Sequence, residues 1–154
     1  MASKRVPKSI PSHFDIYNSV RQAAGQMDLL FHEFLTEQGL TLSQYLVLDA
    51  ISKEEVLTPM QISQELCVSP ASITYTCQSL IKSKLIIKKV DKADRRSMNV
   101  KLTAGGKKLL SSLSQSLSKI SKEFMEILTE REMRQLYTKA ERLKDHLPTT
   151  ESAS

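Results

Sequence analysis

Two dipeptides constrain the fold of this chain more than any other feature. In each, a residue with a side-chain hydroxyl precedes a proline, and the two lie eleven residues apart. Thr58-Pro59 and Ser69-Pro70 each combine a helix-capping residue with a proline at the first helical position, where no N–H is needed. The first pair predicts a short helix that ends at about Leu66, only three residues before the second cap. A connection this short does not let the helices lie parallel, which is the spacing of a helix-turn-helix. The buried positions predicted for the first helix are Met60, Ile62 and Leu66.

The second helix, from Pro70 to about Ser83, has one apolar face and one polar face. Its predicted buried side chains are Ile73, Cys77, Leu80 and Ile81. Short and amide side chains on the other face suit entry into a DNA major groove, where glutamine can pair with adenine. A solvated helix surface is the alternative. The candidate DNA contacts are Ser69, Pro70, Ala71, Ser72, Thr74, Tyr75, Gln78 and Lys82.

The segment that follows favours DNA over plain solvent. Residues 85–90 and 98–102 are β-branched or alternating runs separated by a polar loop, a pattern typical of a hairpin. From Lys82 to Lys108 there are eight Lys and two Arg against two Asp, a net charge of +8, whereas the whole chain carries +5. Basic charge, including Lys88 on the first strand, is therefore concentrated where a DNA backbone would be bound. The sequence predicts a mainly α fold with a small β-wing and double-stranded DNA as the partner.

The run from Val90 to Lys107, with its Asp-x-Arg tip and Leu-Thr-x-x-Gly helix start, resembles the wing of the MarR family of bacterial transcriptional regulators. The resemblance implies that Arg96 enters the minor groove, Asp94 orients it and Arg95 contacts the backbone, with the two arginine roles interchangeable. Relatives often carry an Asp-Arg pair where this chain has Gln78-Ser79, an arginine at the position of Tyr75 and a glycine at that of Lys84. We therefore expect a different operator, and a left-handed backbone at Lys84.

Long amphipathic helices flank this motif. The first, from Phe14 to about Gln38, carries a stripe with alternating spacings of three and four residues. A second begins at the Thr41-x-x-Gln44 capping box and ends near Lys53, a third is capped by Thr103, and a last begins at Thr129-x-x-Glu132. The stripe residues of the first helix are Tyr17, Val20, Ala24, Met27, Phe31 and Phe34; the second helix carries Leu42, Tyr45, Leu46, Leu48 and Ile51; the third carries Leu110, Leu113, Leu117, Ile120, Phe124 and Ile127.

This apolar surface exceeds what the helix-turn-helix can cover, so the sequence predicts a two-fold homodimer; a monomer with folded-back helices is the alternative. The expected organisation is a basic arm at 1–12, a dimerisation helix at 13–38, a winged helix-turn-helix at 39–102, dimerisation helices at 103–147 and a tail at 148–154. No leader or membrane-spanning run is present, so we expect a cytoplasmic protein without a membrane partner.

An effector cleft, a thiol switch and a catalytic or metal centre are three further kinds of site. The resemblance implies a cleft for a small aromatic or anionic effector, with His13, Tyr17, Tyr45 and Lys107 as candidates. Cys67 and Cys77 flank the turn, either as a thiol switch or as inert buried residues, and the burial preference of cysteine favours the second alternative. Catalytic motifs, metal-ligand spacings and cofactor-binding loops are missing, so we expect neither an enzyme, a metal nor a cofactor.

Together these features predict a dimeric, sequence-specific transcriptional regulator, a repressor, that recognises a pseudo-palindromic operator and is released by an effector. The alternatives are an architectural winged helix that binds DNA without sequence choice and a thiol-based redox-sensing regulator.

Overall fold

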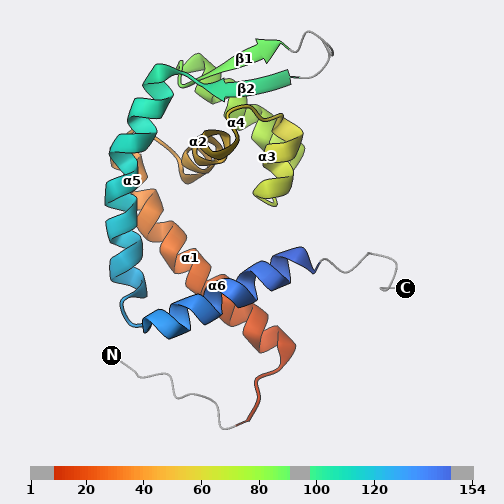
Figure 1. The fold of residues 1–154 in the computed structure, drawn as a ribbon, viewed down its shortest axis with the longest axis vertical. Coiled ribbons are helices and arrows are strands. Elements are labelled where there is room, and N and C mark those ends of the chain that lie inside the picture. Colours follow the sequence, from red (N-terminus) through yellow and green to blue (C-terminus); the bar gives the residue numbers. More distant parts are fainter. Residues whose placement is uncertain (1–8, 91–97, 147–154) are drawn as a thin grey trace, which may run out of the picture. The chain divides into compact units, whose positions relative to one another are not determined.

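The computed structural model of the chain describes residues 9–90 and 98–146. In these ranges helices dominate and the only sheet is a two-stranded hairpin, so the predicted mainly α fold with a small β-wing is confirmed (Figure 1). The wing-tip residues Asp94, Arg95 and Arg96, most of the arm and the tail lie outside the described residues. The elements are α1 His13–Glu37, α2 Leu42–Glu54, α3 Pro59–Glu65, α4 Pro70–Lys82, β1 Ile86–Val90, β2 Met98–Leu102, α5 Ala104–Met125 and α6 Glu130–Asp145.

The chain groups into two compact units, Met1–Leu117 and Ser118–Ser154. The first contains α1 to α4, the hairpin and the N-terminal part of α5. The second contains the end of α5 and α6. The candidate DNA-reading elements therefore all belong to the first unit.

Hydroxyl side chains begin most of the helices, as predicted. Complete capping boxes, in which the hydroxyl accepts from the third helical N–H and that residue's side chain accepts from the cap N–H, occur at Thr41/Gln44, Thr58/Gln61 and Thr129/Glu132. A fourth box, Ser12/Asp15, begins α1 and was not predicted, because Ser12 was assigned to the arm. Each box satisfies N–H groups that the helix itself leaves unpaired.

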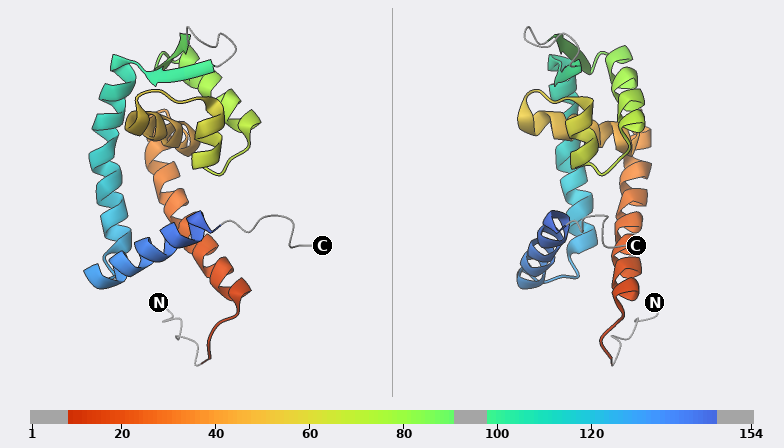
Figure 2. Two further views of the ribbon diagram at one scale, coloured as in Figure 1. Left: turned by 45° about the vertical axis from the view of Figure 1, so that its right-hand side comes forward. Right: turned by 90° about the vertical axis from the view of Figure 1, so that its right-hand side faces the viewer.

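The core of the first unit forms around α2, which contacts α1, α3, α4 and β2 (Figure 1). The hairpin is antiparallel, with Ile86 opposite Leu102 and Lys88 opposite Val100, and both views of Figure 2 show it alongside α4. Leu57 extends the sheet through two reciprocal backbone hydrogen bonds with Val100. The Leu57 N–H donates to the Val100 carbonyl oxygen at 3.1 Å, and the Val100 N–H donates to the Leu57 carbonyl oxygen at 2.8 Å. The largest fully buried side chains are Leu35, Val47, Leu48, Ile51, Ile62, Ile73, Cys77, Leu80, Ile86 and Val100.

Several burial predictions were wrong in the short helices. Met60 is 55% exposed, and Ser63 is buried in α3 instead, because its hydroxyl donates to the Met60 carbonyl oxygen at 2.7 Å and loses no hydrogen bond by burial. Leu66 and Ile81 are only half-buried, since each lies near the end of its helix. Val47 and Ala50, rather than the exposed Leu46, complete the buried face of α2.

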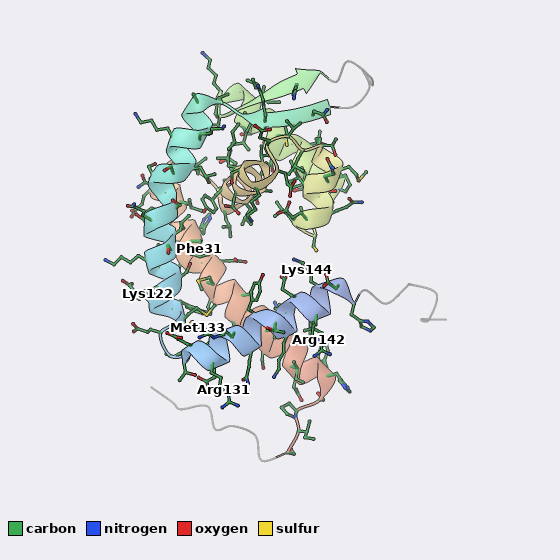
Figure 3. All side chains as sticks on the ribbon, viewed as in Figure 1. Phe31, Lys122, Arg131, Met133, Arg142 and Lys144 are labelled. Atoms are coloured by element: carbon green, nitrogen blue, oxygen red, sulfur yellow. The ribbon has the colours of Figure 1, made fainter. Side chains whose placement is uncertain are left out.

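The apolar stripe of α1 is only partly covered by the described residues, because Met27, Phe31 and Phe34 are half-buried and the N-terminal part is exposed. Leu35 is the only buried residue of the helix, whereas Tyr17 and Val20 are 58% and 56% exposed. Helix α6 has no buried residue, and Figure 3 shows Met133 and Arg142 on it. Ile127, predicted on the stripe of α5, is 85% exposed because the helix ends before it, at Met125. Each helix therefore carries apolar surface that packing within its own unit leaves in contact with solvent.

Candidate nucleic-acid interface

The turn between α3 and α4 is closed by backbone hydrogen bonds. The Val68 N–H donates to the Ser63 carbonyl oxygen at 3.0 Å, and Cys67 adopts a left-handed backbone with φ of +53°. The Ser69 hydroxyl then accepts from the Ser72 N–H at 3.3 Å, which begins α4. This short connection fixes the direction in which α4 leaves the motif, as the cap-and-proline spacing predicted.

Helix α4 presents one buried face and one exposed face. Ile73, Cys77 and Leu80 are exposed by 2% or less, whereas Tyr75 is 76% exposed and Gln78 is also exposed. Tyr75 and Gln78 lie three positions apart, so they are neighbours on one face of the helix. An aromatic ring with a hydroxyl group and a side-chain amide are therefore the main groups that this face offers to a partner.

The predicted DNA contacts in the described ranges lie on α4 or at its cap, apart from Lys88, which is on β1. The half-buried member is Thr74, whose hydroxyl donates to the Pro70 carbonyl oxygen at 2.8 Å and so directs its hydrogen to the helix backbone. The exposed members are Ser69, Pro70, Ala71, Ser72, Tyr75, Gln78, Lys82 and Lys88. Their exposure leaves them available, and their contact with DNA stays a prediction.

A side-chain hydrogen bond from α2 holds the C-terminal half of α4. The Gln44 side chain accepts from the Thr41 N–H at 2.9 Å through Oε1, and its Nε2 donates to the Ser79 hydroxyl at 3.0 Å. Gln44 thus links the cap of α2 to the residue next to Gln78. Sequence analysis identified Gln44 only as a capping residue, because the contact spans 35 positions.

The C-terminal end of α4 is held by the start of α5. Lys84 is left-handed with φ of +59°, as predicted, and the N–H groups of Lys84 and Leu85 donate back to Ile81 and Leu80 at 2.9 and 3.0 Å. The Thr103 hydroxyl lies 2.9 Å from the Lys84 carbonyl oxygen and 3.1 Å from that of Leu85. The sequence predicted Thr103 as a cap but not this contact.

A cleft of about 570 Å³ opens between α2, the hairpin and the first turns of α5. Two of the predicted effector residues, Tyr45 and Lys107, border it. Burial raises the pKa of the half-buried Tyr45 hydroxyl, and the negative charge of Asp49 adds to the effect. The complete lining is Tyr45, Asp49, Ile51, Ser52, Glu55, Val56, Lys89, Lys101, Leu102, Lys107, Leu110, Ser111 and Ser114.

The other two predicted effector residues are not brought to this cleft. His13 and Tyr17 lie in the first turns of α1 and are exposed. Tyr17 stacks on Phe14, with 5.9 Å between the ring centroids. The lysines Lys89 and Lys101 take part in the cleft instead. They were visible in the sequence only as part of the basic segment, because their proximity to α2 depends on strand register.

The two cysteines differ in environment. Cys77 is completely buried, and burial raises the pKa of its thiol to about 11, so it is protonated at neutral pH. The expectation that Cys67 is also buried was wrong, because it occupies the exposed turn between α3 and α4. Only the Cys67 thiol is therefore accessible to solvent, because the Cys77 thiol is buried.

Two further features concern metal binding and membrane insertion in residues 9–90 and 98–146. No group of three or more His, Cys, Asp or Glu side chains in these ranges is close enough to hold a metal ion. No helix in the same ranges is long and apolar enough to span a membrane. Within the described residues, the exposed face of α4 and the cleft are two of the surfaces suited to binding a partner.

Comparison with known proteins agrees with the fold. Residues 38–97 match the sequence profile of the MarR family. The HTH-type transcriptional regulators SarZ of Staphylococcus epidermidis and Staphylococcus aureus are 28% identical over 94 residues, which is 61% of this chain and 64% of theirs. The matched part therefore spans less than two thirds of these relatives.

Two solved structures have the same fold. A mutant of MarR from E. coli in complex with operator DNA aligns with a TM-score of 0.77 and 23% identity, over 87% of this chain and 94% of that one. BpsR of Bordetella bronchiseptica, described as regulated in its DNA binding by 6-hydroxynicotinic acid, aligns with a TM-score of 0.76 and 20% identity, over 84% and 98%. The MarR family profile thus matches the part of the chain that contains the helix-turn-helix, and these two solved structures show that most of the chain has the winged helix-turn-helix fold of such proteins.

Proposed function

We propose that this chain is a homodimeric, sequence-specific DNA-binding transcriptional regulator that acts as a repressor where its pseudo-palindromic operator overlaps a promoter. The observation that carries the proposal is the division of α4 into a face that is almost completely buried and a face that exposes Tyr75 and Gln78. A rigidly held helix with exposed hydrogen-bonding groups, next to a basic hairpin, is suited to reading base edges while lysines contact phosphates.

The dimer is proposed from the exposed N-terminal part of the α1 stripe and from helix α6, which has no buried residue. Exposed apolar side chains recur on one face of α1, from Phe14 at 69% to Val20 at 56% exposed. Surfaces of this kind usually mark an interaction site. A second copy of the chain would bury them and place two α4 helices on one face of the duplex, about 34–36 Å apart. In this organisation 13–38 and 103–147 form the dimer and 39–102 binds DNA.

The decisive experiment is selection from a pool of random duplexes at two salt concentrations. The proposal expects enrichment of an inverted repeat with half-sites about one helical turn apart. Retention without enrichment, with a steep loss of binding in salt, would contradict sequence-specific reading and favour the architectural alternative.

A single substitution separates the same two functions. Gln78→Ala should relax base preference at one position of each half-site by about 1–3 kcal/mol if Gln78 reads a base edge. Gln64→Ala is the matched control, because it removes an exposed amide from α3 rather than from α4. Arg96→Ala, at the wing tip, should weaken binding to every sequence and reduce the salt dependence.

The cleft supports an effector of small aromatic or anionic type as a second part of the proposal. Its volume is in the range of small-molecule sites. Its lining combines apolar side chains with three lysines, Lys89, Lys101 and Lys107, which outnumber the two carboxylates, Asp49 and Glu55. BpsR, which has this fold, is regulated by an aromatic acid according to its description. A planar acid could place its ring on Val56 and Leu110 and its carboxylate near the lysines.

The effector proposal is tested by thermal shift with a set of aromatic acids. Stabilisation should disappear in Lys101→Ala and persist in Lys108→Ala, which removes a lysine that does not border the cleft. Equal responses in the two variants would place any binding outside the cleft, and no response to any acid would contradict this class of effector.

A further inference from the structure

The start of α5 and the end of α4 are joined by a compact set of contacts that the candidate DNA interface does not use. Thr103 makes four polar contacts there. Its N–H donates to the Leu85 carbonyl oxygen at 3.0 Å, and its hydroxyl lies within hydrogen-bond distance of the Lys84 and Leu85 carbonyl oxygens. The same hydroxyl accepts from the Gly106 N–H at 2.9 Å. One side chain therefore caps α5 and contacts the two residues, Lys84 and Leu85, that follow the end of α4.

Gly106 brings the two backbones into direct contact. It is buried in the first turns of α5, and a Cβ atom added there would collide with the Leu85 carbonyl oxygen. Gly105, its neighbour, would tolerate a Cβ, because the nearest atom is the Thr103 hydroxyl oxygen at 3.6 Å. A glycine inside a helix usually weakens it, but Gly106 permits a close approach of the two backbones.

The turn on the other side of this junction is also well ordered by hydrogen bonds. Leu85 donates to Leu80 and Lys84 donates to Ile81, which ties the two contacted carbonyl groups to the last turn of α4. The chain between the two sides consists of the hairpin, so Thr103 and Gly106 connect elements that are adjacent in space but separated by 18 or more positions. We call the group Lys84, Leu85, Thr103 and Gly106 the α4–α5 junction.

We propose that Thr103 and Gly106 are positioning residues that fix the reading helix α4 to the first turns of α5, so that α5 sets the separation of the two reading helices in the dimer. The inference rests on the proposed function, because it requires two copies on DNA. Rigid contact at the junction converts a change in the direction of α5 into a displacement of α4, and therefore into a preference for one half-site spacing. A loose junction would let each α4 adapt separately to its half-site.

The test compares operators whose half-sites are separated by the selected spacing or by one base pair more or less. The wild type should discriminate strongly between spacings, and Thr103→Val and Gly106→Ala should each reduce that discrimination by about tenfold, a typical size for energetic coupling between sites. Thr103→Ser keeps the hydroxyl and should restore wild-type discrimination. Gly105→Ala adds the same methyl group where there is room and should leave it unchanged. Circular dichroism checks that each variant is folded.

Unchanged spacing discrimination in folded Thr103→Val and Gly106→Ala would overturn the proposal. Amide hydrogen exchange of the wild type gives an answer even if these variants do not fold or if no operator is selected. The Gly106 and Leu85 amides should be protected to the same degree as the amides of the buried centre of α4. Exchange at the rate of a frayed helix end would mean that the junction is loose and would overturn the inference without bearing on DNA binding.

Discussion

The side-chain amide of Gln44 on α2 donates a hydrogen bond to the hydroxyl of Ser79 on α4, with 3.0 Å between Nε2 and Oγ. Its carbonyl oxygen simultaneously accepts from the Thr41 N–H, so both ends of the amide are engaged. The residue next to Ser79 is Gln78, the side chain expected to read a base. The cap of α2 and the reading face of α4 are therefore connected through one glutamine.

This link should appear as a coupling energy between Gln44→Ala and Ser79→Ala. We expect the double variant to lose less stability than the sum of the single losses, by about 0.5–1.5 kcal/mol, measured by urea unfolding. Thr58→Ala combined with Ser79→Ala is the control pair, because Thr58 belongs to a separate capping box. Strict additivity for Gln44 and Ser79 would show that their hydrogen bond contributes nothing to stability.

Replacing Lys84 by glycine should stabilise the folded protein. Its φ of +59° is a conformation in which an L side chain is strained, and glycine is not. Lys84→Ala removes the same charge and long side chain but keeps a Cβ, so the comparison isolates the backbone effect. We expect Lys84→Gly to be more stable than Lys84→Ala by about 0.5–1 kcal/mol in chemical denaturation. An equal or lower stability of the glycine variant would contradict a strained backbone.

The cysteines should differ sharply in their reaction with a thiol reagent. Cys67 is exposed, whereas Cys77 is buried and its pKa is raised to about 11, so it presents little thiolate below that pH. Native wild-type protein should be labelled once and Cys67→Ser hardly at all, with both wild-type thiols reacting in denaturant. Rapid labelling of native Cys67→Ser would show that Cys77 becomes accessible, and would revive the thiol-switch alternative.

Local signals in the sequence predicted where three of the helices begin, but they did not predict the end of α5 or the long-range contacts. A capping box can be recognised in the sequence because it involves only four consecutive residues. The boxes that begin at Thr41, Thr58 and Thr129 therefore predicted the starts of three helices. Met60 was misplaced because a seven-residue helix is too short for its apolar pattern to define a face, and its buried polar neighbour Ser63 is satisfied by the backbone. Short amphipathic helices therefore need their tertiary partners before a buried face can be assigned.

The junction and the cleft were hidden from sequence analysis for a different reason. The groups contacted by Thr103 are backbone carbonyl oxygens, which every residue possesses and no sequence pattern distinguishes. Gly106 is visible in the sequence, but a glycine in a helix can mean either a locally less stable helix or a close approach of another backbone. The cleft depends on the register that brings Lys101 near Tyr45, and register is fixed only when the hairpin is packed.

A negative charge in the α1 stripe should dissociate the proposed dimer. Val20 is 56% exposed in the single chain, so Val20→Glu leaves the protomer folded but buries an unpaired carboxylate if a partner covers the stripe. We expect the dimer dissociation constant to rise by about a hundredfold or more, together with weaker binding to an inverted repeat. Gln22→Glu introduces the same charge two positions away, on the opposite side of the helix, and should leave the dimer intact. Sedimentation velocity over a dilution series measures the dimer dissociation constant of both variants. A dimer equally stable in the two variants would show that the stripe is not the interface, and monomeric wild-type protein would contradict the dimer itself.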